Sequence, residues 1–216
     1  GTAISATAGT TTIDVGSGAD ITLKEPSNNF SSVSLVGAGG NPVWLRDDTT
    51  PPGNSMVVSG DADSLRIDAR NLTFGGGSYD SILSFTFGDI DQTGALTVTG
   101  GTVLTSNGAG ATANLASSVN DFNSVGFVNG IGDFAQVSLN DTNGIVLGGE
   151  ATNLSVTAGG TISQNSDLTV SGTTTLTSNA SGLVVNFLTP VYTNDFGTVN
   201  WVNGTGDFNT IALRDT

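Results

Sequence analysis

Short runs in which apolar and polar residues alternate recur along the whole chain. Typical runs are residues 137–139, 154–156 and 168–170, which read Val-Ser-Leu, Leu-Ser-Val and Leu-Thr-Val. Alternation with a period of two places successive side chains on opposite faces of a strand, so each run predicts a strand of about three to five residues with one buried face. Glycine, asparagine and aspartate separate the runs and predict turns. The pattern therefore predicts an all-β protein with almost no helix.

The alternating runs belong to a long internal repeat. Residues 120–142 return as residues 194–216 with 13 of 23 positions identical, and residues 28–48 form a third, more diverged copy. A second stretch, residues 96–107, returns 72 residues later with 9 of 12 positions identical. We expect three successive cassettes of unequal length, cut from a longer array of the same kind. The cassettes cover approximately residues 1–90, 91–164 and 165–216.

Near-identical cassettes favour a coil over a set of hairpins. A short strand of this kind can bury its apolar face only by stacking on a neighbour, which is the principle of a solenoid. A coil of about 20 residues per turn, with turns stacked about 4.8 Å apart, would give about ten turns. The sequence therefore predicts a single right-handed parallel β-helix. A sandwich of β-hairpins is the alternative, because Asn-Gly pairs suited to tight turns recur at equivalent cassette positions.

Phenylalanine recurs at fixed positions of the later cassettes. A large apolar side chain repeated in register is expected to pack in the core or at a corner of the coil and not to contact a ligand. The residues concerned are Phe122, Phe134, Phe196 and Phe208.

Two stretches of the first cassette break the repeat. Residues 72–91 have no clear counterpart in the later cassettes, and this insertion has three possible forms: a loop, an extra turn, or a small hairpin against the coil. Residues 49–54 predict a protruding loop, because Pro51 and Pro52 cannot donate hydrogen bonds to a strand ladder. Insertions in repeat proteins often lie on the binding face, so a partner is expected near these stretches.

Composition narrows the class of partner. The chain has 19 acidic and 5 basic residues, no histidine, and a net charge of −14. It therefore repels phosphate backbones and anionic lipids, and nucleic acid is not an expected partner. It has no cysteine, which fits an exported protein. No apolar run approaches the roughly 20 residues that span a bilayer, so no membrane span is predicted.

Few residues suggest a metal site. Residues 75–82 read Gly-Gly-Gly-Ser-Tyr-Asp-Ser-Ile and come within one residue of a calcium-binding nonapeptide. Such a site shares each ion between consecutive turns, and one isolated copy does not predict it. Asp61 and Asp63 form a short acidic pair of the kind expected at a hydrated corner. Zinc is not expected without cysteine or histidine. We predict no metal site and no cofactor.

A β-helical polysaccharide lyase or glycosidase is the enzyme alternative, because such a coil can mount carboxylates and bases on one face. The chain supplies acids but few cations, and Arg46 and Arg214 occupy equivalent positions where the middle copy has Asn140, which indicates an exposed repeated position. We therefore predict no enzyme activity and no catalytic residue. The five cations are Lys24, Arg46, Arg66, Arg70 and Arg214.

Two features carry a resemblance to a known family. They are residues 153–179 and the cassette pattern NDFxxVxxVNGxGDFxxVxLxDT, which together cover most of the chain. In both, the chain resembles the filamentous haemagglutinin family of two-partner-secretion exoproteins. The resemblance implies a long right-handed parallel β-helix, export through a dedicated outer-membrane pore partner, and a role as an adhesin or another surface or secreted effector.

The expected function is accordingly a structural and adhesive rod of a large secreted protein on the surface of a Gram-negative-type bacterium. The expected partners are the secretion pore during export and a glycan or protein of a host or neighbouring cell. End-to-end self-association is expected as well, because unpaired strand edges invite partners. A self-assembling extracellular filament or sheath subunit is the alternative function, and a carbohydrate-active enzyme is a third.

Overall fold

The alternating runs form strands in the computed structural model of the protein, which describes residues 2, 4–14, 19–37, 40–49 and 55–216. Within these ranges the chain forms strands and turns and no helix. Consequently, none of the described residues belongs to a helix long and apolar enough to cross a membrane. The strands are β1 (Ser5–Asp14), β2 (Ile21–Leu23), β3 (Asn29–Val36), β4 (Val43–Asp47), β5 (Ser55–Gly60), β6 (Ala62–Ala69), β7 (Asn71–Thr86), β8 (Ile90–Gln92), β9 (Leu96–Ser106), β10 (Ala111–Asn129), β11 (Phe134–Asp141), β12 (Ile145–Ala151), β13 (Asn153–Ala158), β14 (Ile162–Ser178), β15 (Leu183–Phe187), β16 (Asp195–Asn203) and β17 (Phe208–Leu213).

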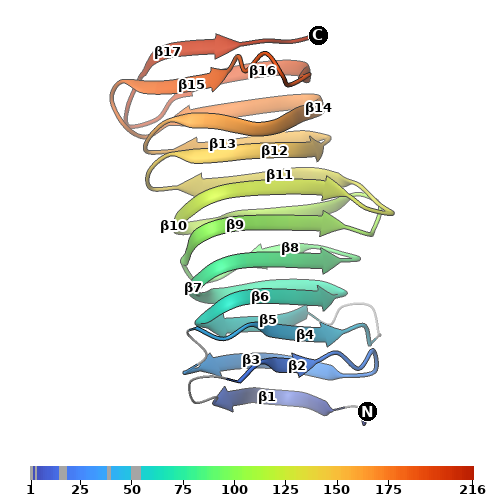
Figure 1. Ribbon diagram of the computed structural model, residues 1–216. Coiled ribbons are helices and arrows are strands. Elements are labelled where there is room, and N and C mark those ends of the chain that lie inside the picture. Colours follow the sequence, from blue (N-terminus) through green and yellow to red (C-terminus); the bar gives the residue numbers. More distant parts are fainter. Residues whose placement is uncertain (1, 3, 15–18, 38–39, 50–54) are drawn as a thin grey trace.

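Each strand pairs with strands one turn away along the chain. β1 pairs with β3 and β3 with β5, while β2 pairs with β4 and β4 with β6, and all of these pairs are parallel. The chain therefore winds as a parallel β-solenoid of about 9 turns. The two termini lie at opposite ends of the column (Figure 1). The predicted parallel coil is confirmed, and the hairpin sandwich is not formed.

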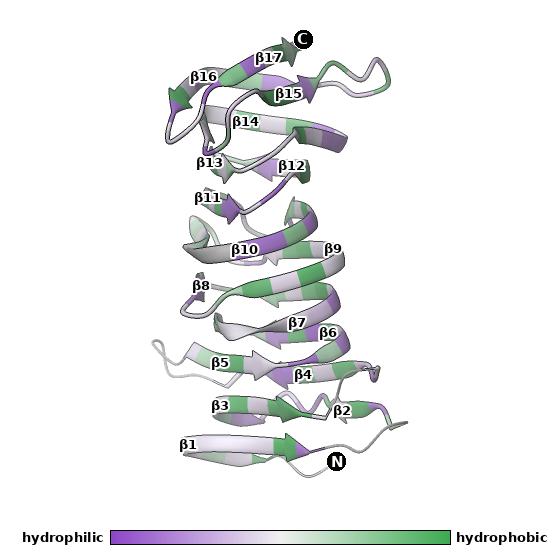
Figure 2. Ribbon diagram, turned by 90° about the vertical axis from the view of Figure 1, so that its left-hand side faces the viewer, coloured by the Kyte–Doolittle hydropathy of each residue, from purple (hydrophilic) through white to green (hydrophobic). Residues whose placement is uncertain are grey.

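Apolar side chains stacked along the axis fill the interior. Leu115, Leu139, Val156 and Leu176 follow one another in register on successive turns and are at most 1% exposed. The residues between such positions are more exposed, so hydrophobic and hydrophilic positions alternate along the strands (Figure 2). Burial of apolar surface stabilises the column by about 25 cal/mol for each Å² that is removed from water.

Residues 72–91 form a turn of the coil that continues the stack, and neither a loop nor a hairpin. β7 pairs with β5 and β6 on one side and with β8 and β9 on the other. Thr86 pairs with Ser106 in the same way as Ala158 pairs with Ser178. Because Ser106 and Ser178 are repeat equivalents, β7 has a structural counterpart in β12 and β13, which sequence divergence conceals.

The other irregular stretch, residues 49–54, lies outside the described residues except for Thr49. Thr49 follows β4, and its hydroxyl donates to Asp47 Oδ1 at 2.7 Å and to the backbone oxygen of Asn28 at 3.0 Å. The start of this stretch is therefore held against the preceding turn.

Candidate functional site

The most strongly repeated residues lie inside the coil, at one corner of the turn. Asn28, Asn120 and Asn194 occupy the same cassette position and are at most 1% exposed. In two cassettes a buried glutamine joins them, and Asn120 and Asn194 donate from Nδ2 to Gln92 and Gln164 Oε1 at 3.1 and 2.9 Å. The Oδ1 atoms of the three asparagines accept the backbone N–H groups of Ile4, Leu96 and Leu168 at 2.9, 2.9 and 3.1 Å. These amides clamp one turn to the next.

A carboxylate and a threonine complete the same corner. The backbone N–H groups of Phe30, Phe122 and Phe196 donate to Asp47, Asp141 and Asp215 at 2.7, 2.6 and 3.0 Å. Burial raises the pKa of Asp141, and the hydrogen bonds from the backbone of Phe122 and Asn143 oppose this rise. The hydroxyls of Thr49, Thr142 and Thr216 donate to the backbone oxygens of Asn28, Asn120 and Asn194 at 3.0, 2.9 and 2.8 Å. The repeated motif NDF…LxDT is therefore engaged in closing the turns.

The repeated phenylalanines pack as the sequence predicted. Phe122 and Phe134 are fully buried, and Phe196 is 7% exposed. Phe208, in the last turn, is half-buried and meets Trp201 edge-to-face with ring centroids 5.9 Å apart. The recurring aromatic positions belong to the core and not to a ligand site.

The acidic residues near the glycine-rich stretch gather in a shallow, exposed depression. Asp61 Oδ1 accepts the backbone N–H of Ser78 at 3.0 Å, and Asp80 Oδ1 accepts the hydroxyl of Thr99 at 2.7 Å. A hydrogen bond to Asp80 is the main cause that raises the pKa of Asp63. Among the residues described, no group of three or more Asp, Glu, His or Cys is placed to hold a metal ion. These aspartates are therefore engaged in hydrogen bonds with the backbone and with neighbouring side chains.

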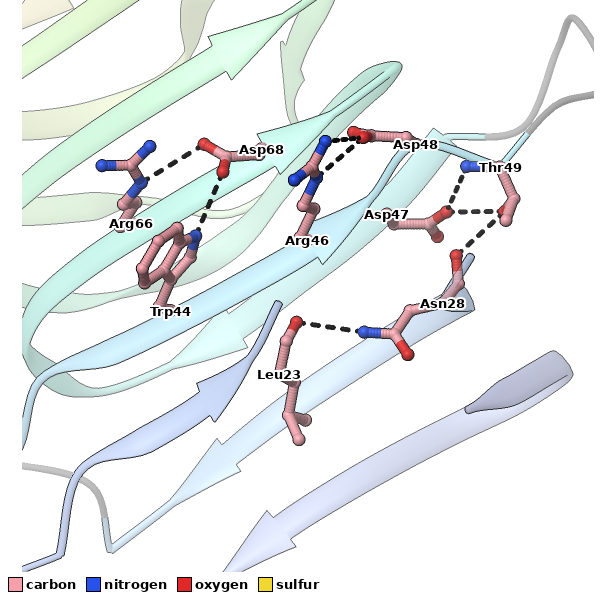
Figure 3. Close-up of polar contacts among 9 residues, drawn as sticks. All are labelled: Leu23, Asn28, Trp44, Arg46, Asp47, Asp48, Thr49, Arg66 and Asp68. Atoms are coloured by element: carbon pink, nitrogen blue, oxygen red, sulfur yellow. Dashed lines mark hydrogen bonds and ion pairs between the residues drawn. The ribbon is translucent and has the colours of Figure 1, made fainter. Parts of the chain in front are cut away.

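A different cluster lies on the lateral face of the column, around Trp44 of β4 (Figure 3). The guanidinium of Arg66, one turn further on, lies between two aromatic rings, with its Cζ 4.4 Å from the Trp44 centroid and 4.8 Å from that of Phe85. Asp68 accepts the indole N–H of Trp44 at 3.1 Å and forms an ion pair with Arg66 at 3.4 Å. Lys24 approaches the other side of the cluster, 5.4 Å from the Trp44 centroid. Stacking and ion pairing together hold Arg66 in one orientation.

A second arginine extends this cluster toward the corner of the coil. Arg46 donates from Nε to Asp48 Oδ2 at 2.7 Å, and its Nη2 lies 2.5 Å from the same oxygen. The hydrogen bond to Asp48 raises the pKa of Arg46, so its charge is firmly retained. We name Trp44, Arg46, Asp48, Arg66, Asp68, Phe85 and Phe87 the lateral cluster.

The lateral cluster departs from the repeat. The ladder places Thr157 and Gly159 of the later cassette at the positions of Phe85 and Phe87. The cassette alignment likewise places Ser138 and Asn140 at the positions of Trp44 and Arg46. A turn of this coil therefore forms with small or polar residues at these outward positions. Folding alone does not require the aromatic rings and arginines of the lateral cluster.

The sequence predicted an exposed position for Arg46 and Arg214 but did not predict the cluster. The side chain of Arg46 is 37% exposed, and Arg214 is exposed and donates from Nη1 to the backbone oxygen of Pro190 at 3.3 Å. The spacing of Trp44 and Arg66 could have revealed their contact. They are 22 residues apart, which is about one turn, and they pair directly in the ladder.

A family model described as "Repeats of unknown function (DUF5649)" matches residues 1–37, 59–129 and 135–203. The chain belongs to this family. Each matched block contains one clamp asparagine with its phenylalanine, whereas Asp47 and Asp215, which accept the N–H groups of Phe30 and Phe196, lie outside the matched residues. No curated protein and no solved structure matches the chain.

Proposed function

We propose that this chain is a segment of a rigid rod in a large secreted bacterial surface protein, and that the rod presents adhesive elements on its lateral face. The proposal rests on the difference between the side chains inside the coil and those on its outer face. Repeated side chains point inward and clamp the turns, while the lateral cluster stands outward and differs in its residues from the equivalent positions of the middle cassette. A scaffold with an independent outer surface is the arrangement that an adhesive rod requires.

The resemblance to filamentous haemagglutinins supports an extracellular location and export through an outer-membrane pore partner. A chain without cysteine can cross membranes unfolded without forming disulfides on the way. The surrounding medium and the bacterial surface are thus the proposed site of action, and a glycan or protein of another cell is the proposed class of partner.

The proposal assigns no catalysis to the rod. Asp61 and Asp80 have a structural role in this proposal, because they accept hydrogen bonds from the backbone of Ser78 and the hydroxyl of Thr99. The exposed arginines Arg46 and Arg66 are each paired with an aspartate on their own strand or at its end.

Antibodies against the 216-residue chain would test the proposal on intact cells of the source bacterium. We expect labelling without permeabilisation, release of the antigen by external protease, and weaker attachment of cells from which the repeat region has been deleted. Cells lacking an unrelated surface protein provide the control. Labelling only after permeabilisation would contradict the proposed location, and unchanged attachment would contradict the adhesive role.

A self-assembling filament subunit is the second candidate, because the open strand edges at the end of a parallel coil can pair with further strands. Trp201 of β16 is 36% exposed and Ile211 of β17 is 41% exposed, whereas their repeat equivalents Phe127 and Val137 are fully buried. An apolar edge with unpaired strands can receive another β-strand. Under this candidate, that strand comes from a second copy of the chain.

A further inference from the structure

A hollow of about 260 Å³ lies beside the lateral cluster, lined in part by the two ion pairs described above. Phe87 stands at its rim, at the corner that follows β7, and is 49% exposed. The backbone of Phe87 is fixed, because its N–H donates to the backbone oxygen of Ala69 at 3.3 Å and the next corner passes closely at Gly108. The ring therefore provides an apolar patch on a fixed backbone at the edge of a polar hollow.

The hollow offers hydrogen-bond donors and acceptors without a net charge. Arg46 and Arg66 are balanced by Asp48 and Asp68. Both contacts from Arg46 go to Oδ2 of Asp48, which leaves Oδ1 as an acceptor. Ion pairing engages only Nε of Arg66 within the described part of the chain, so its Nη groups remain as donors.

Asn107 adds a further donor from the turn above. Its Oδ1 accepts the backbone N–H of Ile131 at 3.4 Å, which orients the amide and directs Nδ2 away from that bond. Asn107 lines the same hollow as the two arginines and Phe87. The site thus combines one apolar patch with a few fixed polar groups, which is the usual make-up of a small-ligand site.

We propose that this hollow binds a neutral sugar residue of a polysaccharide. The C–H face of the pyranose ring would pack on Phe87, and its hydroxyls would bond to Asp48, Arg66 and Asn107. Hydroxyl groups both donate and accept, which matches the mixed set of partners in the hollow. This inference rests on the proposed adhesive function and names the chemistry of its partner.

The charge of the chain selects a neutral sugar over an acidic one. The net charge is −14, and the two arginines of the hollow are already paired with aspartates. An anionic polymer would approach a repelling surface and would have to compete with those carboxylates. A protein partner would need a much larger surface than this hollow provides.

Native gel electrophoresis through soluble polysaccharides tests the inference, because the acidic chain migrates strongly toward the anode. The neutral polysaccharides are dextran, a mannan and a galactan, each in its own gel, and polygalacturonate serves as the acidic one. We expect at least one neutral polysaccharide to retard the chain and polygalacturonate not to do so. Phe87→Ala should weaken that binding about tenfold, since it removes the apolar contact.

Leu188→Ala is the matched control, because Leu188 is a similarly exposed apolar residue, 53% exposed, at the corner after β15. This control should bind like the unchanged chain. Arg66→Ser is a second test variant that keeps Phe87, and it should also weaken binding. Circular dichroism and the melting temperature establish that each variant is folded.

Three results would overturn the inference: no retardation by any of the three neutral polysaccharides, retardation by polygalacturonate alone, or equal binding by folded Phe87→Ala and the unchanged chain. The attachment of cells tests the adhesive function separately. If cells carrying Phe87→Ala still attach in a manner that depends on the protein, the rod remains adhesive and only the assignment of the hollow is wrong.

Discussion

Single polar side chains buried in the corners decide how each turn closes on the next. Asn120 is fully buried, and its Nδ2 donates to the backbone oxygen of Leu115 at 2.9 Å and to Gln92, while Oδ1 accepts from Leu96. A buried amide is tolerated only when its hydrogen bonds are made, because an unmade one costs about 1–3 kcal/mol. The repeated asparagine therefore fixes the path of the chain at this corner as well as stabilising it.

Asp141→Asn should lower the free energy of unfolding by about 1–3 kcal/mol at neutral pH. The two carboxylate oxygens of Asp141 accept the backbone N–H groups of Phe122 and Asn143 at 2.6 and 2.9 Å, and an amide has only one such oxygen. One buried donor would lose its acceptor. Denaturant unfolding measures the loss, and Asp91→Asn, at an exposed position, should change stability by no more than about 0.5 kcal/mol.

The unchanged chain and Asp141→Asn should differ in how their stability depends on pH. Burial raises the folded-state pKa of Asp141 above the unfolded value of about 3.9. Between those two values the folded state holds more protons than the unfolded state, so the stability of the unchanged chain falls as the pH rises. Its advantage over Asp141→Asn should therefore narrow as the pH rises above about 4 over a titration to neutral pH. A constant difference across that range would contradict the raised pKa.

At the scale of strands, glycines allow successive turns to approach closely where the ladder shifts register. Gly60 and Gly149 have φ angles of +101° and +124°, which favour glycine. A Cβ atom on Gly149 would lie 1.8 Å from the backbone oxygen of Phe127, and one on Gly60 would lie 2.0 Å from that of Leu35. Because Leu35 and Phe127 are repeat equivalents, the same bulge recurs beside two copies of the corner.

Gly149→Ala should destabilise the chain by about 1–3 kcal/mol or more, since the side chain would strain the backbone and displace the neighbouring turn. Gly126→Ala is the matched control in the same sheet, because a Cβ there would find its nearest atom at 3.8 Å. The control should be neutral or slightly stabilising. Thermal unfolding of the two variants measures the difference, and equal melting temperatures would show that the bulge can relax.

At the scale of the whole molecule, the turns stack into a column in which the strands of each layer pair with those of the layer before it (Figure 1). The interior turns are sealed, as the full burial of Phe127 and Val137 shows. The last described turn leaves Trp201 and Ile211 partly open. Each turn of a solenoid contacts only the turns next to it, so a strand added to this edge would cover both side chains.

The filament candidate predicts that the purified 216-residue chain forms fibres at low micromolar concentration. Ile211→Lys should prevent this, because it places a charge on the apolar edge of β17. Thr97→Lys, a substitution at an exposed position on the side of the column, should leave assembly unchanged. Sedimentation and electron microscopy measure the outcome, and a chain that stays monomeric throughout would exclude self-assembly through this edge.

Local pattern predicted much of this architecture. Alternation predicted the strands, the repeat predicted their stacking, and the recurring phenylalanines were correctly placed in the core. The role of Asn120 escaped prediction because its partners Gln92 and Leu96 lie a full turn away. The nature of residues 72–91 was also left open, since a turn with diverged residues carries no repeat to reveal it.

The sequence by itself determined that this protein is a parallel coil with an acidic surface, because alternation, repetition and charge are properties of residue order. Only the tertiary structure decided which outward side chains meet. Val43, Leu65, Ile82 and Thr102 stack on successive turns, yet the number of residues between them changes from one turn to the next. Bulges set that register, so the meeting of Trp44, Arg66 and Phe85 on one face depends on how the backbone packs and not on any fixed spacing.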